Sequence, residues 1–263
     1  MSQAADLAID ARGVATITLN RPEVHNAFDD LLIAHLIDLI GQARGNPQVN
    51  VLVLASTGKS FSAGADLGWM RRMADATRDD NLKDAHQLAA LMENLNNFPC
   101  PTVARIQGTV MGGGVGLVAC CDVAIASDNA FFALSEVKLG LAPAVISPYV
   151  IAKIGTSQAR RYFVTAERFS AIRAAAIDLV HEVVPLTELE ARTEQIIAAL
   201  LANGPQAMRR AKELAQVANP LPATSALRDY TTGVIADLRA SAEGKEGLRA
   251  FLEKDAPAWI AKH

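Results

Sequence analysis

Cysteine is scarce in this 263-residue sequence, which contains only Cys100, Cys120 and Cys121. Adjacent cysteines rarely bridge each other, and the three residues lack the paired spacing of a metal site. The sequence therefore excludes a disulfide-rich secreted scaffold and predicts buried, reduced thiols in a cytoplasmic protein. The acidic first residues, MSQAADLAIDARG, have no apolar signal core, which agrees with that expectation.

A strong excess of charge is also missing, as is any long apolar run. The formal net charge is −3, so no general attraction to nucleic acid or to an acidic membrane is expected. No apolar stretch approaches the roughly 20 residues that cross a bilayer. We therefore expect neither nucleic acid nor a membrane as a partner of this chain.

The sequence does contain enough apolar material for a large core. Hydrophobic residues make up 51% and charged residues 20%, as in one large α/β domain or one domain with an appendage. Amphipathic helices are expected at 28–43 and 82–95. Strands are expected around and between these helices, at 13–19, 50–56, 101–108, 122–127 and 130–134.

The pattern changes in the second half, which is almost entirely helical in character apart from one strand expected at 181–185. Gly204 and Pro205 mark the clearest boundary, which predicts a core of residues 1–200 and a C-terminal helical region of 201–263. The helical stretches beyond this boundary carry too little apolar area to fold alone. We expect them to pack on the core or on another subunit.

Two glycine-containing motifs fail on their spacing. The run STGKS at 56–60 has the ending of a phosphate-binding loop, but the glycine required at position 53 is a valine. The run at 112–116 lacks the third glycine of a dinucleotide fingerprint. Neither segment is therefore expected to bind a nucleotide in these ways.

Two other glycine-rich segments carry the functional signal. FSAGADL at 61–67 follows the apolar run 50–56, and MGGGVGL at 111–117 follows 101–108. A strand, a turn of small residues and a helix together aim backbone N–H groups into open space. Two such turns on neighbouring strands can converge on one oxygen atom, which predicts an oxyanion hole.

Glu136 is the candidate acid–base residue, because it follows a strand just after the second glycine turn. Burial among Leu134, Val137 and Leu139 would raise the pKa of its carboxyl group and suit it to move protons near neutral pH. The alternative is a surface carboxylate that pairs with Lys138.

Several segments in series resemble the crotonase (enoyl-CoA hydratase/isomerase) superfamily. They are LNRPEVHNAF (19–28), FSAGADL (61–67), the triple-glycine turn, CDVAIAS (121–127), LSEVKLGLAP (134–143) and SAEGKEGLRAFLEK (241–254). Their detail is most similar to the bacterial methylglutaconyl-CoA hydratases, and also to the isohexenylglutaconyl-CoA hydratases. The resemblance implies an α/β spiral of ββα units with a C-terminal helical trimerisation region, assembled as a homotrimer or as a hexamer built from two trimers.

The resemblance also implies the roles of individual residues. The N–H groups of Ala65 and Gly113 would hold the oxygen of an acyl-CoA thioester, while Glu136 would move the proton. Enolate charge on that oxygen needs fixed dipoles that small residues leave accessible. Coenzyme A is part of the substrate, and neither a metal nor a redox cofactor is implied.

Further substrate contacts follow from the same resemblance. The residues implied are Val24, Ala27, Ala63, Asp66, Leu67, Gly112, Phe251 and Lys254. Phe251 and Lys254 would reach the nucleotide from the C-terminal helix of the same chain or of a neighbour, although Lys254 is equally a solvated cation at a helix end. The segment 68–82 is expected to wall the acyl pocket, and its Trp69 belongs either to that wall or to the core.

One position departs from the pattern of the best-known hydratases. They carry a second glutamate two residues after the triple glycine, where this chain has Gly116. Without it, Glu136 acts alone, or a substrate carboxylate assists it, or the enzyme is a double-bond isomerase, which needs only one base. The subgroup resemblance favours a hydratase that adds water across the 2,3 double bond of 3-methylglutaconyl-CoA or a related branched glutaconyl-CoA. The alternative is an enoyl-CoA double-bond isomerase.

Overall fold

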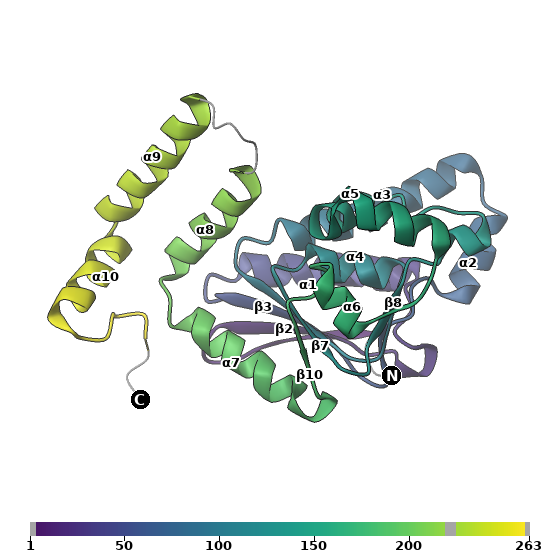
Figure 1. Cartoon of the computed structure of the whole chain (residues 1–263), viewed down its shortest axis with the longest axis horizontal. Coiled ribbons are helices and arrows are strands. Elements are labelled where there is room, and N and C mark those ends of the chain that lie inside the picture. Colours follow the sequence, from purple (N-terminus) through teal and green to yellow (C-terminus); the bar gives the residue numbers. More distant parts are fainter. Residues whose placement is uncertain (1–3, 219–224, 261–263) are drawn as a thin grey trace.

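Two β-sheets lie at the centre of the computed structural model, which describes residues 4–218 and 225–260 (Figure 1). The larger sheet runs in the order β1 (Ala5–Ile9), β2 (Val14–Leu19), β3 (Val51–Ser56), β5 (Thr102–Ile106), β7 (Val123–Ser127) and β10 (Glu182–Val184). The smaller sheet runs in the order β4 (Ser60–Ser62), β6 (Thr109–Met111), β8 (Phe131–Ala133) and β9 (Phe169–Ser170). The β1–β2 and β8–β9 pairs are antiparallel, and the other pairs are parallel.

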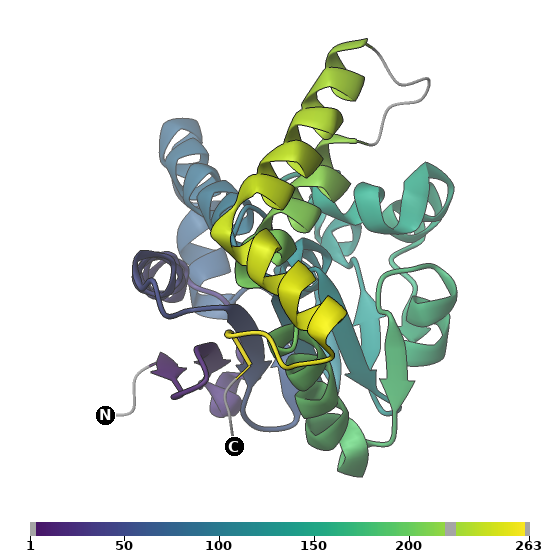
Figure 2. The same ribbon diagram turned by 90° about the vertical axis from the view of Figure 1, so that its left-hand side faces the viewer.

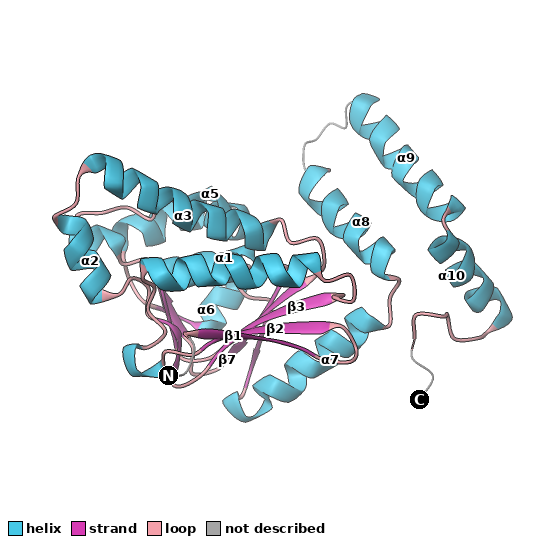
Figure 3. Cartoon of the chain, turned by 180° about the vertical axis from the view of Figure 1, so that it is seen from behind, coloured by secondary structure: helices cyan, strands magenta, loops and turns pink. Residues whose placement is uncertain are grey.

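Helices cover both faces of the larger sheet. Those of the body are α1 (Asp30–Gly45), α2 (Leu67–Ala74), α3 (Arg78–Asn96), α4 (Gly113–Cys120), α5 (Ser147–Thr165), α6 (Ala171–Ala176) and α7 (Leu189–Leu201). Figure 3 shows α1 and α3 side by side on one face, and α7 on the opposite face. None of the helices within residues 4–218 and 225–260 combines the length and the apolar character that crossing a membrane requires.

The chain winds as a spiral of ββα units, as the family resemblance implies. The pairs β3–β4, β5–β6 and β7–β8 each supply one strand to each sheet, and a helix follows each pair. The corner between β5 and β6 requires a glycine, because Gly108 has a φ of +61° and a Cβ there would lie 1.9 Å from the carbonyl oxygen of Lys59. Repetition of this unit brings the ends of β4, β6 and β8 together at one edge.

The fully apolar sequence of β3 is explained by burial of both its faces. Leu52 and Leu54 pack into the main core under α1 and α3. Val51 and Val53 pack on the other face, in a second cluster with Leu189 of α7. A strand covered on both sides reads as a continuous apolar run, and this is why 50–56 shows no alternation.

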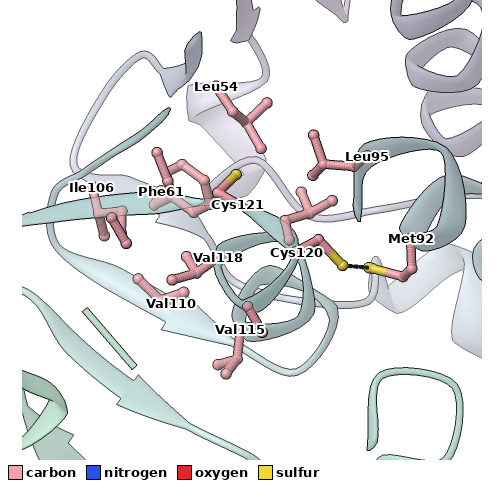
Figure 4. Close-up of a cluster of buried hydrophobic side chains, with 14 of the residues drawn as sticks. Leu54, Phe61, Met92, Leu95, Ile106, Val110, Val115, Val118, Cys120 and Cys121 are labelled. Atoms are coloured by element: carbon pink, nitrogen blue, oxygen red, sulfur yellow. Dashed lines mark hydrogen bonds between the residues drawn. The ribbon is translucent and has the colours of Figure 1, made fainter. Parts of the chain in front are cut away.

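The short helix α4 lies in the middle of the main core (Figure 4). Residues 114–120 are all buried. The Sγ atom of Cys120 lies 3.8 Å from the Sδ atom of Met92, and burial raises the pKa of the Cys121 thiol to about 12. Cys100, Cys120 and Cys121 are all free and buried, which confirms the expectation of buried thiols.

A helical tail follows the body, made of α8 (Pro205–Val217), α9 (Ser225–Ala240) and α10 (Ala242–Glu253). The first of these helices starts at the expected boundary and is tied to the body by Lys212, whose Nζ lies 2.7 Å from Asp122 Oδ2. The other two lie apart from the body in Figure 1 and in front of it in Figure 2, which faces that side of the molecule. Leu248, Phe251 and Leu252 of α10 are exposed, so the core of the same chain does not cover them. Packing of this helix on another subunit stays a prediction.

Two kinds of element differ from the expectation. The sequence does not predict β1, β4, β6 and β9. The last three are strands of two or three residues, too short to show an alternation of apolar and polar positions. Strand β1 lies at the edge of the larger sheet with mostly exposed side chains, so it shows no apolar run. Helix α3 begins at Arg78 rather than at residue 82. Its first turn is polar but well capped, since the Oγ1 atom of Thr77 accepts a hydrogen bond from the N–H of Asp80 at 3.2 Å.

Candidate active site

The two glycine turns lie next to each other, as expected. Strands β4 and β6 are parallel neighbours, so the turns at their carboxyl ends meet at one edge of the smaller sheet. A Cβ on Gly64 would lie 3.1 Å from the carbonyl oxygen of Met111, and one on Gly112 would lie 3.9 Å from the Cα of Gly64. Only small residues allow the two backbones to approach this closely.

The first turn presents the N–H group of Ala65. Phe28 forms an isolated parallel bridge with Ala65, in which Phe28 N–H donates to Gly64 O and Asp66 N–H donates to Phe28 O, both at 2.7 Å. Alternate residues of an extended segment direct their backbone groups to opposite sides. The N–H of Ala65 therefore points away from Phe28, and it has no hydrogen-bond partner within residues 4–218 and 225–260.

The second turn presents the N–H group of Gly113. This glycine is the first residue of α4, where the helix leaves N–H groups without an internal partner. Gly112 precedes it with a φ of +50°, a left-handed conformation that favours glycine. Within the described part of the chain the Gly113 N–H has no partner, and the positive end of the α4 dipole adds to its attraction for an anion.

Glu136 faces this edge from the segment after β8. Its Oε1 atom lies 3.3 Å from the position that a Cβ on Gly112 would take. Its Oε2 atom is buried, and among the described residues it is the one buried side-chain polar atom without a hydrogen-bond partner. Burial raises the pKa of the Glu136 carboxyl above its ordinary value.

The environment of Glu136 supports a buried carboxyl group but corrects the residues expected to bury it. Leu134 is buried, whereas Val137 and Leu139 are 37% and 58% exposed. Within residues 4–218 and 225–260 no ion pair joins it to Lys138, so the surface-pair alternative is wrong. A buried carboxyl group with a raised pKa and an unpartnered oxygen is suited to accept and return a proton near neutral pH. It lies beside two N–H groups that are also unpartnered, which is the arrangement that enolate chemistry requires.

A loop at residues 21–28 holds the first turn in place. The buried side chain of Asn26 donates from Nδ2 to the carbonyl oxygens of Thr57 (2.9 Å) and Ser60 (2.8 Å). Its Oδ1 accepts from the N–H of Arg21 at 2.8 Å. Sequence reasoning did not single out Asn26 or Phe28, although both lie in the segment LNRPEVHNAF that carries the resemblance.

The expected substrate-binding residues around this loop have different surroundings. Val24 is half-buried, Ala27 is buried and Ala63 is half-buried, with the Ala63 N–H donating to the carbonyl oxygen of His25. Leu67 is 72% exposed at the start of α2 and is free to contact a ligand.

Asp66 has a structural contact that the sequence did not predict. It caps α2 by accepting from the N–H groups of Gly68 (2.8 Å) and Trp69 (3.1 Å). Arg21 also lies 3.7 Å from its carboxylate. The helix cap accounts for an aspartate at this position, and contact with the substrate stays a prediction.

The expected acyl-pocket wall is built from α2 and α3. Trp69 is 8% exposed, belongs to the main core, and donates from Nε1 to Asp84 Oδ1 at 3.1 Å. The alternative that placed this tryptophan in the core is therefore confirmed. Met73 packs against the core, whereas Met70 is half-buried.

Phe251 and Lys254 are not brought to the site within one chain. Both belong to the end of α10, which lies at the opposite end of the molecule from α2 (Figures 1 and 3). Phe251 is 81% exposed. A contact between these residues and the substrate would have to come from a neighbouring subunit.

Comparison with known proteins agrees with this geometry. A family model described as enoyl-CoA hydratase/isomerase matches residues 10–262. The crystal structure of an enoyl-CoA hydratase from Shewanella pealeana has a TM-score of 0.94 and 44% sequence identity, and covers 98% of this chain and 96% of that one. The structure of Pseudomonas aeruginosa AtuE has a TM-score of 0.93 and 34% identity, over 98% of this chain and 100% of that one.

A curated relative leads to the same family. The hydroxycinnamoyl-CoA hydratase-lyase of Pseudomonas fluorescens is 34% identical over 203 residues, which are 76% of this chain and 74% of that protein. The match of nearly the whole chain to the family model, together with these relatives, shows that the chain belongs to the enoyl-CoA hydratase/isomerase family.

Proposed function

We propose that this protein is an enoyl-CoA hydratase that adds water to a branched glutaconyl-CoA, with 3-methylglutaconyl-CoA as the first candidate. The observation that carries the proposal is the unpartnered Oε2 of Glu136 beside the unpartnered N–H groups of Ala65 and Gly113. The hydratases among its relatives support the reaction type, and the subgroup resemblance of LSEVKLGLAP and SAEGKEGLRAFLEK supports the substrate class.

In this mechanism the thioester oxygen accepts hydrogen bonds from Ala65 and Gly113. As the oxygen of water bonds to Cβ, the π electrons of the double bond move toward the carbonyl and negative charge builds on its oxygen. Fixed N–H dipoles meet this charge without reorganising, and each is worth about 3 kcal/mol in related oxyanion holes. The two donors therefore act mainly on the transition state.

Glu136 handles the proton in both halves of the reaction. Its ionised carboxylate removes a proton from the attacking water, and the resulting carboxylic acid returns a proton to Cα as the enolate collapses. One water molecule is added and the carboxylate is regenerated. The raised pKa of Glu136 favours the first half, because it makes the carboxylate a stronger base toward the attacking water.

The remaining substrate contacts belong to the same proposal. Val24, Ala27, Ala63, Asp66 and Leu67 would flank the coenzyme A portion, with Gly112 beside the thioester. The exposed end of α10, with Phe251 and Lys254, would contact the nucleotide of a neighbouring subunit in a trimer or hexamer. The exposed apolar side chains of α10 support assembly through this region.

The experiment is a panel of thioesters assayed in D2O with one purified sample. The panel holds 3-methylglutaconyl-CoA, crotonyl-CoA and a 3-enoyl-CoA. We expect 3-methylglutaconyl-CoA to lose its enoyl absorbance fastest and to gain one deuterium at Cα. Shuttling of the double bond without uptake of water would contradict the proposal and identify an isomerase.

A further inference from the structure

The side chain of Arg21 joins the loop before α1 to the first glycine turn. Its Nη1 atom donates to the carbonyl oxygen of Ala27 at 3.1 Å and to Asp29 Oδ2 at 2.7 Å. Its Nη2 atom lies 3.7 Å from Asp66 Oδ2. The side chains of Asp29, Asp66 and Arg21 are 17%, 19% and 20% exposed, so water screens these charges less than it screens an ion pair on the surface. One guanidinium group thus contacts the segments that lead into α1 and α2.

Asp29 and Asp66 divide their two carboxylate oxygens in the same way. Oδ1 of Asp29 accepts from the N–H of Leu32 at 2.8 Å and caps α1. Oδ1 of Asp66 accepts from two N–H groups in the first turn of α2 and caps that helix. The Oδ2 atom of each aspartate faces Arg21. Without a cation between them, the two carboxylates would repel each other and separate the two helix ends.

The bridge that orients the Ala65 N–H lies between these contacts. Arg21 bonds to the residues on both sides of Phe28 and pairs with the residue that follows Ala65. The bridge between Phe28 and Ala65 is an isolated one, outside the strands of the two sheets, so no ladder of its own keeps the two segments in register. The side chain of Arg21 supplies that restraint instead.

The backbone of Arg21 is anchored independently of its side chain. Its N–H donates to Asn26 Oδ1 at 2.8 Å, and its carbonyl oxygen accepts from the N–H of Asn26 at 2.9 Å. Asn26 itself is 0% exposed. Because a substitution at position 21 keeps both of these hydrogen bonds, it removes the guanidinium contacts without removing the support of the loop.

We propose that Arg21 is a positioning residue for enolate stabilisation: it holds the caps of α1 and α2 at a fixed separation and thereby keeps the Ala65 N–H aimed at the thioester oxygen. This inference rests on the oxyanion hole of the proposed function and deepens it. The planar fork of arginine suits the task, because its separate N–H groups reach a carbonyl oxygen and two carboxylates at once. Lysine carries all its donors on one nitrogen atom, so it keeps the charge but spans these acceptors less well.

The first test reads the hydrogen bonds of the hole directly, by isotope-edited infrared spectroscopy of bound butyryl-CoA labelled at the thioester carbonyl. This saturated ester has no double bond to hydrate, and it carries the coenzyme A portion common to all candidate substrates. Hydrogen bonds from the hole lower the carbonyl stretching frequency. Arg21→Met should reduce that shift to about half of the wild-type value, because one of the two donors is misplaced.

Turnover should follow the infrared shift. We expect Arg21→Met to lower kcat/KM by about 10- to 100-fold, and Arg21→Lys to recover part of both the rate and the shift because it restores the charge. The full wild-type shift in Arg21→Met would overturn the inference, even if that variant is less stable than the wild type.

Arg192→Met is the matched control. Arg192 pairs with Glu182 through Nε at 2.6 Å and Nη2 at 2.7 Å, and so joins α7 to β10. We expect the control to lower the urea midpoint while it keeps the wild-type infrared shift and kcat/KM. A shift that shrinks equally in the control would attribute the effect to general destabilisation and reject a specific role of Arg21.

The second test uses the repulsion between the two caps. Asparagine caps a helix as well as aspartate does, so Asp29→Asn keeps α1 capped and removes one charge. In the wild-type background this change removes a partner of Arg21 and should lower kcat/KM about threefold. In the Arg21→Met background it relieves the repulsion with Asp66, so it should raise kcat/KM. A change of the same sign in both backgrounds would contradict the proposed arrangement.

Failure of this inference is separable from failure of the proposed function. If the thioester panel reveals an isomerase while the infrared shift still depends on Arg21, the hydratase proposal fails and the role of Arg21 stands, because both reactions pass through an enolate. If the shift is independent of Arg21 but turnover depends on Glu136, only the role of Arg21 is lost. A wild-type protein that binds the ester without any shift would reject the oxyanion hole and this inference together.

Discussion

Phe28 contacts both halves of the proposed oxyanion hole, because its backbone pairs with Ala65 while its ring lies against Gly113. The bridge orients the Ala65 N–H through two hydrogen bonds of 2.7 Å on its flanks. On the other side, a Cβ on Gly113 would lie 2.8 Å from Cε2 of the Phe28 ring. One residue of the loop before α1 thus sets the relative position of donors from two separate ββα units.

Gly113→Ala should disrupt this arrangement. The added methyl group displaces the Phe28 ring and, with it, the bridge that orients Ala65. A misplacement of about 1 Å can cost about 100-fold in rate, and we expect a loss of that order in kcat/KM. Steady-state kinetics with an enoyl-CoA substrate provides the measurement.

Gly41→Ala is the control for that variant. Gly41 lies within α1, and a Cβ there meets no atom within 4 Å. We expect unchanged kinetics and a gain in the free energy of unfolding of about 1 kcal/mol from the better helix propensity of alanine. Wild-type kcat/KM in Gly113→Ala would refute the role assigned to the contact with Phe28.

Glu136→Gln should leave the fold intact and remove most turnover. Glutamine has the same shape but cannot accept the proton of water, so we expect kcat to fall by about 10²- to 10⁴-fold. Binding of a saturated acyl-CoA, measured by calorimetry, should change little. The control is Glu188→Gln, an exposed carboxylate next to α7 that should keep full activity. Comparable kcat values for the two variants would reject Glu136 as the acid–base residue.

The pH profile should report the raised pKa of Glu136. Water addition needs the ionised carboxylate, so kcat/KM should fall as the pH drops through the pKa of this group. Because burial raises that pKa, the acid limb should lie above 4.5, the ordinary value for a glutamate. Initial rates across the acid range locate the limb, and an inflection at or below 4.5 would contradict a buried base.

The raised pKa of Glu136 should also make the free energy of unfolding depend on pH. A carboxyl group whose pKa is higher in the folded state than in the unfolded state binds more protons when folded, so it destabilises the fold as the pH rises through this range. Glu136→Gln removes that penalty. We therefore expect the variant to be more stable than the wild type at neutral pH, and the difference to vanish below the ordinary pKa of 4.5. Urea unfolding at neutral and at acid pH measures both values, and a variant less stable than the wild type at neutral pH would contradict the assignment.

The sequence points to the proposed reacting groups more readily than to their supports. Ala65, Gly113 and Glu136 lie in short motifs whose chemistry is local, because a glycine turn after a strand exposes N–H groups wherever it occurs. Phe28 and Asn26 act through contacts with residues distant in the chain, at Ala65 and at Thr57 and Ser60. No periodicity or composition encodes such a contact, so only the folded arrangement identifies them.

The same distinction applies to the fold. The strand β3 and the helix α1 follow from long apolar patterns, and the structure places them within one or two residues of the expected bounds. Of the smaller sheet, β8 is the strand expected at 130–134, whereas β4, β6 and β9 could not be predicted from propensity because they are two or three residues long. The sheet depends on the spiral, which pairs β4 with β6 and β6 with β8 although these strands are distant in the chain.

Asn26→Asp tests the support of the first turn without altering the backbone. Asn26 has a φ of +54°, a conformation that both asparagine and aspartate tolerate. Aspartate cannot donate to the carbonyl oxygens of Thr57 and Ser60, and it places a charge where the side chain is 0% exposed. We expect a loss in the free energy of unfolding of about 2 kcal/mol or more, with a fall in kcat/KM as the turn that carries Ala65 loosens.

The control is Asn203→Asp, an exposed position whose amide bonds only to Ala199 O, where the change should stay below about 0.5 kcal/mol. Equal stability of the two variants in urea unfolding would show that the buried amide does not hold the turn.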